Sequence, residues 1–184
     1  MPSWNSRGLR GSTLEELINY SNEKYRENHL ALVQKIPTPI TPLKIDKANK
    51  QITLAYFEQK STVDYIGAVQ GIPICFDAKE CASDTMSLAN IHPHQVSFMQ
   101  EFEAQGGISF FVLFFSSRDT YYYLKLDTLL TFWERAEKGG RKSFLYSELD
   151  PSWQISPHNG VFVHYLAQLN RDLSERDAKK EQET

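Results

Sequence analysis

The alternation of side chains around Asp77 constrains the fold more than any other feature of this sequence. In the segment 72–79, Asp77 and Lys79 stand two residues apart, and the apolar residues Phe76 and Ala78 alternate with them. Successive side chains of a β-strand point to opposite faces, so a strand here places the carboxylate and the ammonium on one face. The apolar flank predicts a buried strand, and charged groups near a core are commonly paired or bound to metal.

A second carboxylate, Asp64, lies 13 residues before Asp77. The short segment Tyr65–Val69 follows it and Gly71 marks a turn, so an antiparallel hairpin would return Asp64 to the side of Asp77. Two carboxylates that meet supply the hard oxygen ligands that Mg²⁺ prefers. With Lys79 beside them they predict a site for phosphodiester cleavage, although an isolated Asp-x-Lys on a strand usually lies on a solvated face.

Length and composition favour one globular domain. The chain has 184 residues, of which 41% are hydrophobic and 23% charged, and can bury roughly two thirds of its unfolded surface. The longest apolar run, Ile108–Phe115, is too short to span a bilayer, and the N-terminus lacks a signal-peptide pattern, so we expect a cytoplasmic protein. Cys75 and Cys81 have no metal-type spacing and are expected to be free thiols.

The charge distribution leaves room for a basic surface, although the net charge is -3. Residues 1–50 carry eight Lys or Arg against five acidic residues, which is a local charge of +3. The pI near 6.0 is weak evidence against a broad nucleic-acid surface. Carboxylates that hold a cation do not repel DNA, however, so binding of nucleic acid stays open.

Two terminal segments flank a single predicted domain of residues 12–170. Residues 1–11, with Arg7 and Arg10, are expected to form a flexible basic arm. Residues 171–184 are mixed in charge and are expected to be a solvated tail.

A proline-rich stretch predicts an excursion from this domain. The prolines between residues 36 and 42 exclude a central strand, because proline lacks the backbone donor. The segments that follow can pair as a hairpin, so we expect a protruding stalk over residues 36–57. Lys44, Lys47 and Lys50 would lie towards its tip, where they either contact phosphate or are simply solvated.

The remaining segments predict an α/β fold, a central mixed sheet flanked by helices. Expected in chain order are a helix from Thr13 to Asn28, a strand from Leu30 to Lys35, the Asp64 and Asp77 strands, a polar loop from Cys81 to Asn90, a helix opening at Pro93, strands Ile108–Phe115 and Thr120–Leu126, a helix Thr128–Glu137, and a last amphipathic helix that includes Val161. Arg141 and Lys142 lie in a basic glycine-containing turn suited to phosphate contact.

Six short blocks of the sequence form a pattern that is more specific than any one of them alone. They are Gly11–Glu16, Lys35–Ile40, Ser61–Tyr65, Phe76–Glu80, Asn90–Gln95, and Phe132–Arg135 taken with Gly140–Ser143. Together they resemble the RecU family of Holliday junction resolvases, within the restriction-endonuclease-like PD-(D/E)xK nucleases. The resemblance covers nearly the whole chain and implies a restriction-endonuclease-like mixed β-sheet with a protruding β-hairpin stalk.

The resemblance implies a role for each site residue. Thr62, Asp64, Asp77 and Gln95 correspond to metal ligands, and Lys79 to the residue that positions the attacking water and stabilises transition-state charge. Without the resemblance, Thr62 is better explained as an ordinary strand threonine, whereas for Gln95 a helix N-terminal cap and a site residue are equally good explanations. The family more often has Glu at the position of Asp77, which leaves the metal distance open.

The resemblance also implies a homodimer that uses Mg²⁺, with one or two ions per site. Such a dimer resolves four-way DNA junctions by symmetric nicking of two strands during homologous recombination and DNA repair. The stalk would enter the centre of the junction, and Arg7 and Arg10 would replace the longer arm of relatives. Glu15 matches a first-helix glutamate near the metal in related resolvases; compensation of the helix dipole is the alternative. Recombinase and branch-migration proteins are further partners that the resemblance suggests, and no membrane is involved.

Three other interpretations stay open. His92 and His94 with Cys75 and Cys81 could form the zinc site of a structural binding module. The same fold could serve as a non-cleaving, junction-binding or recombinase-modulating protein, although the intact acidic pair and Lys79 argue against it. A sequence-specific restriction-type endonuclease would share the metal site, but it needs base-reading loops that are not identifiable here.

Overall fold

The computed structural model describes residues 13–37, 39–57 and 62–182 of the chain. The helices are α1 Leu14–Glu27, α2 Pro93–Ala104, α3 Leu126–Glu137 and α4 Tyr165–Gln182, with short 3₁₀ helices η1 Leu88–Asn90, η2 Ser116–Arg118, η3 Tyr146–Glu148 and η4 Pro151–Trp153. The strands are β1 Leu32–Lys35, β2 Ile40–Asp46, β3 Gln51–Phe57, β4 Tyr65–Val69, β5 Ile72–Cys81, β6 Thr85–Ser87, β7 Ile108–Phe115, β8 Thr120–Lys125, β9 Ser143–Leu145 and β10 Gln154–Ile155. The expected basic arm, with Arg7 and Arg10, lies outside the described residues.

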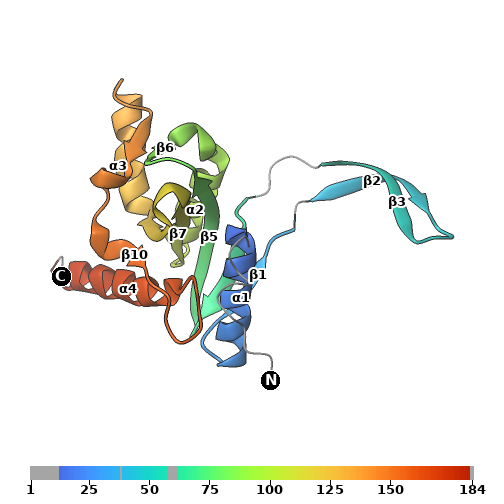
Figure 1. Ribbon diagram of the computed structural model, residues 1–184, viewed down its shortest axis with the longest axis horizontal. Helices are drawn as coiled ribbons and strands as arrows, with labels where there is room; N and C mark the ends of the chain where they lie inside the picture. The colour runs from blue at the N-terminus through green and yellow to red at the C-terminus, as the bar shows by residue number, and fades with distance from the viewer. Residues whose placement is uncertain (1–12, 38, 58–61, 183–184) are drawn as a thin grey trace.

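Six strands form one mixed sheet in the order β1-β4-β5-β7-β8-β10 (Figure 1). Strands β5 and β7 run parallel, and the other neighbouring pairs are antiparallel. A parallel pair needs a long crossover connection, and α2 lies within it. The predicted α/β fold, a mixed sheet flanked by helices, is therefore confirmed.

Aromatic rings stack from strand to strand across one face of the sheet. Tyr65 on β4 lies with its ring centroid 4.7 Å from that of Phe76, Phe76 lies 4.8 Å from Phe110, and Phe110 lies 4.3 Å from Tyr123. Tyr165 at the start of α4 covers the row, with its ring centroid 5.0 Å from that of Phe76. Each such pair adds about 0.5–1.5 kcal/mol beyond the burial of its area, so the row binds four strands and α4 together.

Helix α1 covers the same face beside α4. It begins where expected, because Thr13 accepts a hydrogen bond from Glu16 N–H and the Glu16 side chain accepts one from Thr13 N–H. Near its other end, Tyr25 packs edge-on against Tyr165, with centroids 5.2 Å apart. The two helices thus share one aromatic contact above the sheet.

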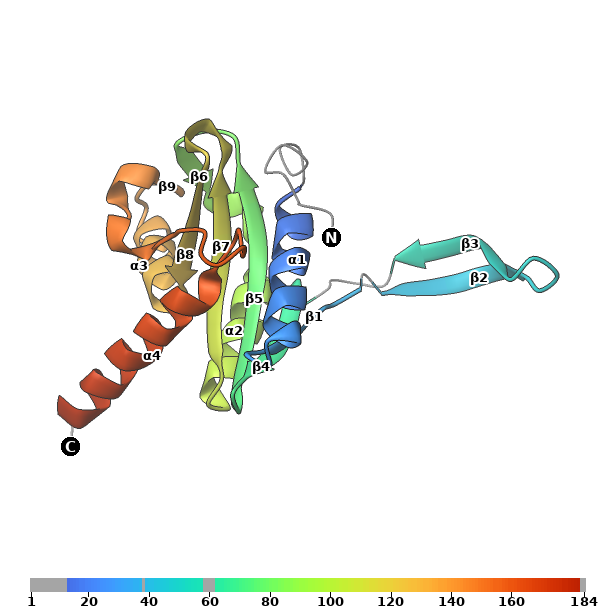
Figure 2. The same ribbon diagram turned by 60° about the horizontal axis from the view of Figure 1, so that its bottom comes forward.

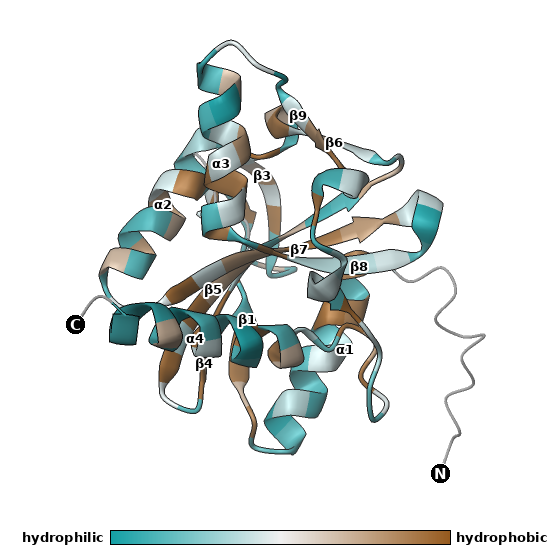
Figure 3. Ribbon diagram, turned by 90° about the vertical axis from the view of Figure 1, so that its left-hand side faces the viewer, coloured by the Kyte–Doolittle hydropathy of each residue, from teal (hydrophilic) through white to brown (hydrophobic). Residues whose placement is uncertain are grey.

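Helix α2 covers the opposite face of the sheet, and α3 packs beside it. Ser109 on β7 donates a hydrogen bond to the carbonyl of Met99 on α2 at 3.1 Å, and Cys75 Sγ lies 3.2 Å from Ser109 Oγ. Asp77 shares this face of β5 with Cys75, so α2 lies over it. Figure 3 shows β5 and β7 in hydrophobic colours between α2 and α4.

Cys75 and Cys81 are free thiols, as predicted.

Strands β2 and β3 form a two-stranded ribbon that projects from the body of the protein (Figure 1, Figure 2). Pro42 lies within β2 opposite Ala55, and the register shifts on both sides of Lys44. A two-stranded ribbon has only edge strands, where proline is tolerated, so this ribbon accepts Pro42 where a central strand would not. The predicted protruding hairpin is confirmed, and we call it the stalk.

The C-terminal segment differs from the expectation of a solvated tail. Helix α4 begins at Tyr165 rather than near Val161 and continues to Gln182. Asp172 is 2% exposed; it accepts hydrogen bonds from Tyr123 Oη and from Arg176 Nε, each at 3.0 Å. The structure therefore differs from the expected tail at residues 171–176, where contacts with a distant strand and with α2 partly bury one turn of the helix, whereas residues 177–182 are helical but exposed.

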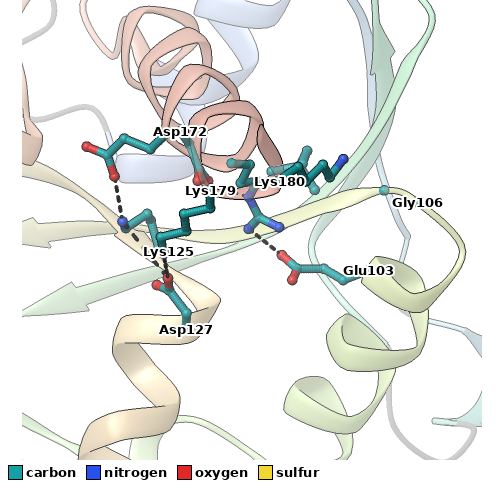
Figure 4. A pocket seen from close by; sticks show the side chains of 11 residues that line it. Glu103, Gly106, Lys125, Asp127, Asp172, Lys179 and Lys180 are labelled. Carbon is teal, nitrogen blue, oxygen red and sulfur yellow. Dashed lines mark hydrogen bonds and ion pairs between the residues drawn. The ribbon is translucent and has the colours of Figure 1, made fainter. Parts of the chain in front are cut away.

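Ion pairs fasten this helix to the end of the sheet around a pocket of about 390 Å³ (Figure 4). Arg176 Nη2 donates to Glu103 Oε1 at 2.8 Å, and Lys125 Nζ lies 2.9 Å from Glu175 Oε2. The charged side chains lining the pocket thus pair with one another across α2, β8 and α4. We therefore interpret these lining residues as holding α4 against the sheet rather than as a ligand site.

The expected polar loop from Cys81 to Asn90 also contains regular structure. Strand β6 pairs with β9, with Met86 opposite Phe144, and η1 follows. Both strands have three residues, too few for an alternation pattern to be recognised. Among the described residues, no helix is long and apolar enough to cross a membrane.

Replacement of Arg176 by Met tests the ion pairs of α4. It leaves the buried Asp172 without its cation, so we expect the free energy of unfolding to fall by about 2 kcal/mol in urea denaturation. Lys138→Met removes an exposed pair with Glu134 and should change stability little. Equal losses of stability in the two variants would show that the Arg176 ion pairs contribute no more than an exposed pair. Adding Asp172→Asn to Arg176→Met removes the unpaired charge and should restore part of the lost stability.

Candidate active site

The hairpin of β4 and β5 carries Asp64 to the side of Asp77. Its two turn residues, 70–71, have φ of 48° and 90°, which match the right-handed twist of a two-residue hairpin. In the resulting register Tyr65 lies opposite Phe76, so the residues just outside that pair, Asp64 and Asp77, meet on the other face. The predicted hairpin geometry is confirmed.

The two aspartates hold each other through the backbone. Asp64 N–H donates a hydrogen bond to Asp77 Oδ1 at 3.1 Å, and Ala78 N–H donates one to Asp64 Oδ2 at 2.9 Å. Each carboxylate is therefore oriented by the strand that carries the other. This reciprocal arrangement leaves little freedom for either side chain.

Asp77 is completely buried, and three elements converge on its carboxylate. Besides Asp64 N–H, Oδ1 accepts a hydrogen bond from Gln95 Nε2 at 2.9 Å. The other oxygen, Oδ2, lies 2.5 Å from Lys79 Nζ. That contact is an ion pair without hydrogen-bond geometry, so Oδ2 is a buried oxygen with no hydrogen-bond partner. Asp77 and Lys79 share a face of β5, as the alternation predicts.

The surroundings of Asp77 disfavour its ionised form. Burial, followed by the neighbouring Asp64 carboxylate, raises the pKa of Asp77 to about 7, and Lys79 only partly opposes this. A second cation close to Asp77 would relieve both unfavourable effects.

These features fit a divalent metal. Asp77 Oδ2 faces the Lys79 ammonium but accepts no hydrogen bond, and Asp64 supplies a second hard oxygen donor beside it. In the described part of the chain, no group of three or more His, Cys, Asp or Glu side chains could hold a metal ion. Asp64 and Asp77 are thus the two carboxylates that the described residues bring together at this site.

Gln95 reaches Asp77 from the first turn of α2. Its Oε1 accepts a hydrogen bond from His92 N–H at 3.2 Å, and its Nε2 donates to Asp77. Turning the amide would place Nε2 against the His92 N–H, two donors in contact, so His92 fixes the orientation. The capping role and the contact with the site, which were alternatives at the sequence level, therefore coexist. Its oxygen faces the helix cap rather than Asp77.

Thr62 and Glu15 are the remaining candidates for the metal site. Thr62 is half-buried, two residues before Asp64 along the chain. Glu15 forms an ion pair with Lys35, the last residue of β1, which is opposite Tyr65 on the face turned away from Asp77. No local pattern signals this pair, because its members lie 20 residues apart on different elements. Glu15 thus has a basic partner outside the aspartate pair.

The basic residues predicted to contact DNA fall into two places. Lys44 lies in β2, and Lys47 and Lys50 lie at or beside the exposed tip of the stalk. Arg141 and Lys142 are exposed in the turn between α3 and β9. The stalk and the turn are thus two separate exposed basic surfaces.

The zinc interpretation lacks a ligand group among the described residues. Cys75 contacts Ser109 beneath α2, whereas Cys81 Sγ lies 3.1 Å from the carbonyl oxygen of Ser83. The rings of His92 and His94 stack on each other with centroids 5.4 Å apart. The histidines and cysteines therefore have separate structural roles.

Comparison with known families decides the assignment. The family model for RecU, described as Recombination protein U, matches residues 9–171. The chain belongs to the RecU family. The Holliday junction resolvase RecU of Limosilactobacillus reuteri (strain DSM 20016) is 39% identical over 168 residues, covering 89% of this chain and 78% of the relative. That of Oceanobacillus iheyensis is 40% identical over 167 residues, covering 88% and 85%.

A third RecU relative, from Oenococcus oeni, is 43% identical over 143 residues, which cover 76% of this chain and 73% of the relative. Among solved structures, the Holliday junction resolvase Hjc of Archaeoglobus fulgidus aligns over 60% of this chain and 77% of its own, with 6% identity and a TM-score of 0.38. That likeness is too weak to establish a common fold, so the RecU assignment depends on the sequence relatives.

The orientation of Gln95 in this RecU chain can be tested by Gln95→Glu. The variant keeps an oxygen for the His92 cap but replaces the donor to Asp77 by a carboxylate. We expect a loss of about 2 kcal/mol in the free energy of unfolding at pH 7, measured by urea denaturation. Gln100→Glu, on the exposed face of the same helix, is the matched control and should have little effect. Equal stability of the two variants would show that Nε2 does not face Asp77.

Proposed function

We propose that this protein resolves Holliday junctions by Mg²⁺-dependent hydrolysis of phosphodiester bonds at Asp64, Asp77 and Lys79. As a member of the RecU family, it is an endonuclease that cleaves crossover junctions. The observation that best supports this location of the active site is the buried Asp77 carboxylate. Asp64 adjoins it, Lys79 forms an ion pair with its Oδ2, and that oxygen accepts no hydrogen bond.

The residues of the proposed site have two roles, which are to bind the metal and to stabilise the negative charge of the transition state. When bound, the metal would polarise the scissile phosphate and lower the pKa of a water molecule. Asp64 and Asp77 would hold it, and the hydrogen bonds that they accept from backbone N–H groups keep both carboxylates oriented. Lys79 is 19% exposed and can present its ammonium to the negative charge that builds on the phosphate.

Neutral oxygens complete the proposed ligand set. Thr62 precedes Asp64 by two residues, which keeps its hydroxyl on the same segment of chain. Gln95 would have to turn its amide to offer its oxygen, which breaks its bonds to His92 and Asp77. Without that change, Gln95 acts by orienting Asp77. Glu15 would likewise have to leave Lys35 to serve as an accessory ligand.

Asp64→Asn and Lys79→Ala test the active site. With Mg²⁺, the wild-type protein should nick a labelled synthetic four-way junction symmetrically and leave linear duplex largely uncut. Each variant should lose at least about 100-fold in nicking rate while junction binding persists. Lys179→Ala, at the distant end of α4, is the control and should cut normally.

Two outcomes would contradict these assignments. Normal cutting by Asp64→Asn or Lys79→Ala would show that the active site lies elsewhere. Binding without any cutting by the wild-type protein would favour the non-cleaving junction-binding interpretation.

A homodimer is part of the proposal, because two nicks of like polarity require two sites related by a two-fold axis. The stalk offers a surface for the second copy. One face of the ribbon carries four apolar residues that are each 47–58% exposed, namely Ile45, Ile52, Leu54 and Tyr56. In a monomer such an apolar stripe would remain in water, whereas the same stripe on a second copy is self-complementary.

The basic residues complete the proposed DNA contacts. Lys44, Lys47 and Lys50 would meet phosphates where the stalk enters the open centre of the junction. Arg141 and Lys142 would meet a duplex arm beside the active site. Affinity should therefore depend mainly on branched shape and on salt concentration.

Leu54→Lys and Thr53→Lys test the stalk contact as a matched pair. Both add one charge to adjacent positions of β3, but only Leu54 lies on the apolar stripe. In sedimentation at micromolar concentration we expect Leu54→Lys to be largely monomeric and Thr53→Lys to remain dimeric. Dimers of equal stability would place the interface elsewhere, and a monomeric wild type would overturn the dimer itself.

A further inference from the structure

The basic turn between α3 and β9, residues 138–143, folds back onto Arg135. Gly139 has a φ of 84°, and Gly140 N–H donates a hydrogen bond to the Arg135 carbonyl at 2.9 Å. A Cβ atom at Gly140 would lie 2.7 Å from that carbonyl oxygen and 2.9 Å from Arg135 Cγ. Only glycine therefore permits the first half of the turn to pack so closely on this arginine.

The Arg135 side chain also holds the second half of the turn. Its Nη2 donates a hydrogen bond to the Ser143 carbonyl at 2.7 Å, and its Nη1 donates to Glu148 Oε1. The guanidinium lies over the Phe132 ring, 5.1 Å from the centroid, and its Nε is buried without a hydrogen-bond partner. Arg135 thus bridges both ends of the turn and the following 3₁₀ helix, η3.

Two arginines approach the same carboxylate. Glu148 Oε2 accepts a hydrogen bond from Leu145 N–H at 2.8 Å and lies 3.9 Å from Arg141 Nη1. Arg135 is the closer partner, and its hydrogen bond is the main cause that lowers the pKa of Glu148. Arg141, with 54% of its side chain exposed, remains largely available to solvent. Without Arg135, Glu148 would draw Arg141 towards itself.

The turn adjoins the element that orients Asp77. The carbonyl of Lys142 accepts a hydrogen bond from Leu88 N–H at 3.1 Å, and Leu88 begins η1. The chain continues from η1 to His92 and to Gln95, whose Nε2 donates to Asp77. A phosphate bound at the turn would therefore contact a segment that is joined, through η1, to the helix whose Gln95 orients Asp77.

We propose that Arg135 is a positioning residue for DNA binding, which neutralises Glu148 so that Arg141 and Lys142 stay available to a phosphate. This role rests on the proposed function, because it concerns the DNA that the active site cuts. Arg135 itself does not touch the phosphate. Its effect is electrostatic and acts through Glu148, which distinguishes it from a purely structural arginine.

The test is binding of a synthetic four-way junction without divalent metal, measured over a range of salt concentrations. Each phosphate contact contributes roughly one unit to the slope of log affinity against log salt. Arg135→Met should lower the slope by roughly one per protomer and the affinity about 5- to 10-fold at about 0.1 M salt. The double variant Arg141→Ala, Lys142→Ala should lower the slope of log affinity against log salt by roughly two per protomer.

Rescue separates the electrostatic role from a structural one. Adding Glu148→Gln to Arg135→Met removes the competing carboxylate but keeps an acceptor for Leu145 N–H, and should restore the wild-type slope. Arg135→Lys keeps a cation beside Glu148 and should retain the wild-type slope even if Arg135→Met folds poorly. Thermal unfolding of each variant checks the fold.

Three results would overturn the proposal. A wild-type slope in folded Arg135→Met would show that Glu148 does not withdraw Arg141. An unrescued slope in the double variant would show that Arg135 acts through its own charge or through the fold. An unchanged slope when Arg141 and Lys142 are both replaced would show that the turn does not meet DNA. Cleavage of the same junction by the wild-type protein with Mg²⁺ tests the proposed function separately.

Discussion

A completely buried carboxylate, Asp77, is the constraint on which the rest of this structure depends. Removing a carboxylate from water is unfavourable by several kcal/mol unless hydrogen bonds and a cation offset the loss. Here the compensating groups come from three directions: the backbone of Asp64 before β4, the side chain of Gln95 on α2, and Lys79 on β5 itself. Satisfying one side chain therefore fixes the hairpin and the start of α2 relative to the central strand.

Strand alternation lets one strand serve both stability and chemistry. Phe76 and Asp77 are neighbours in sequence but lie on opposite faces of β5. Phe76 stands in the stacked aromatic row that joins four strands and α4, whereas Asp77 lies under α2. The aromatic face supplies favourable packing free energy to a strand whose other face contains a buried charge. This pairing explains how a sheet can hold an unfavourable carboxylate at its centre.

Sequence patterns predicted those parts of the fold that depend on neighbouring residues. Alternation placed Asp77 with Lys79, and a turn signal returned Asp64 to them, because both rules act over fewer than about fifteen residues. The course of α4 was missed, since the burial of Asp172 comes from Tyr123 and Arg176, and Tyr123 lies 49 residues away. Strands β6, β9 and β10 have three residues or fewer and form only because other elements hold them. The double role of Gln95 likewise depends on the tertiary position of α2.

The stalk and the proposed metal site share one stretch of backbone. Ile36, where the chain leaves β1 for the stalk, donates its N–H to the Asp64 carbonyl at 2.8 Å. The N–H of the same Asp64 holds Asp77 Oδ1, whereas Gln95 holds the same oxygen from α2. A displacement of the stalk would therefore shift Asp64 against an Asp77 that α2 keeps in place. If the stalk enters a junction, recognition of branched shape and the spacing of the two carboxylates are mechanically connected through Asp64.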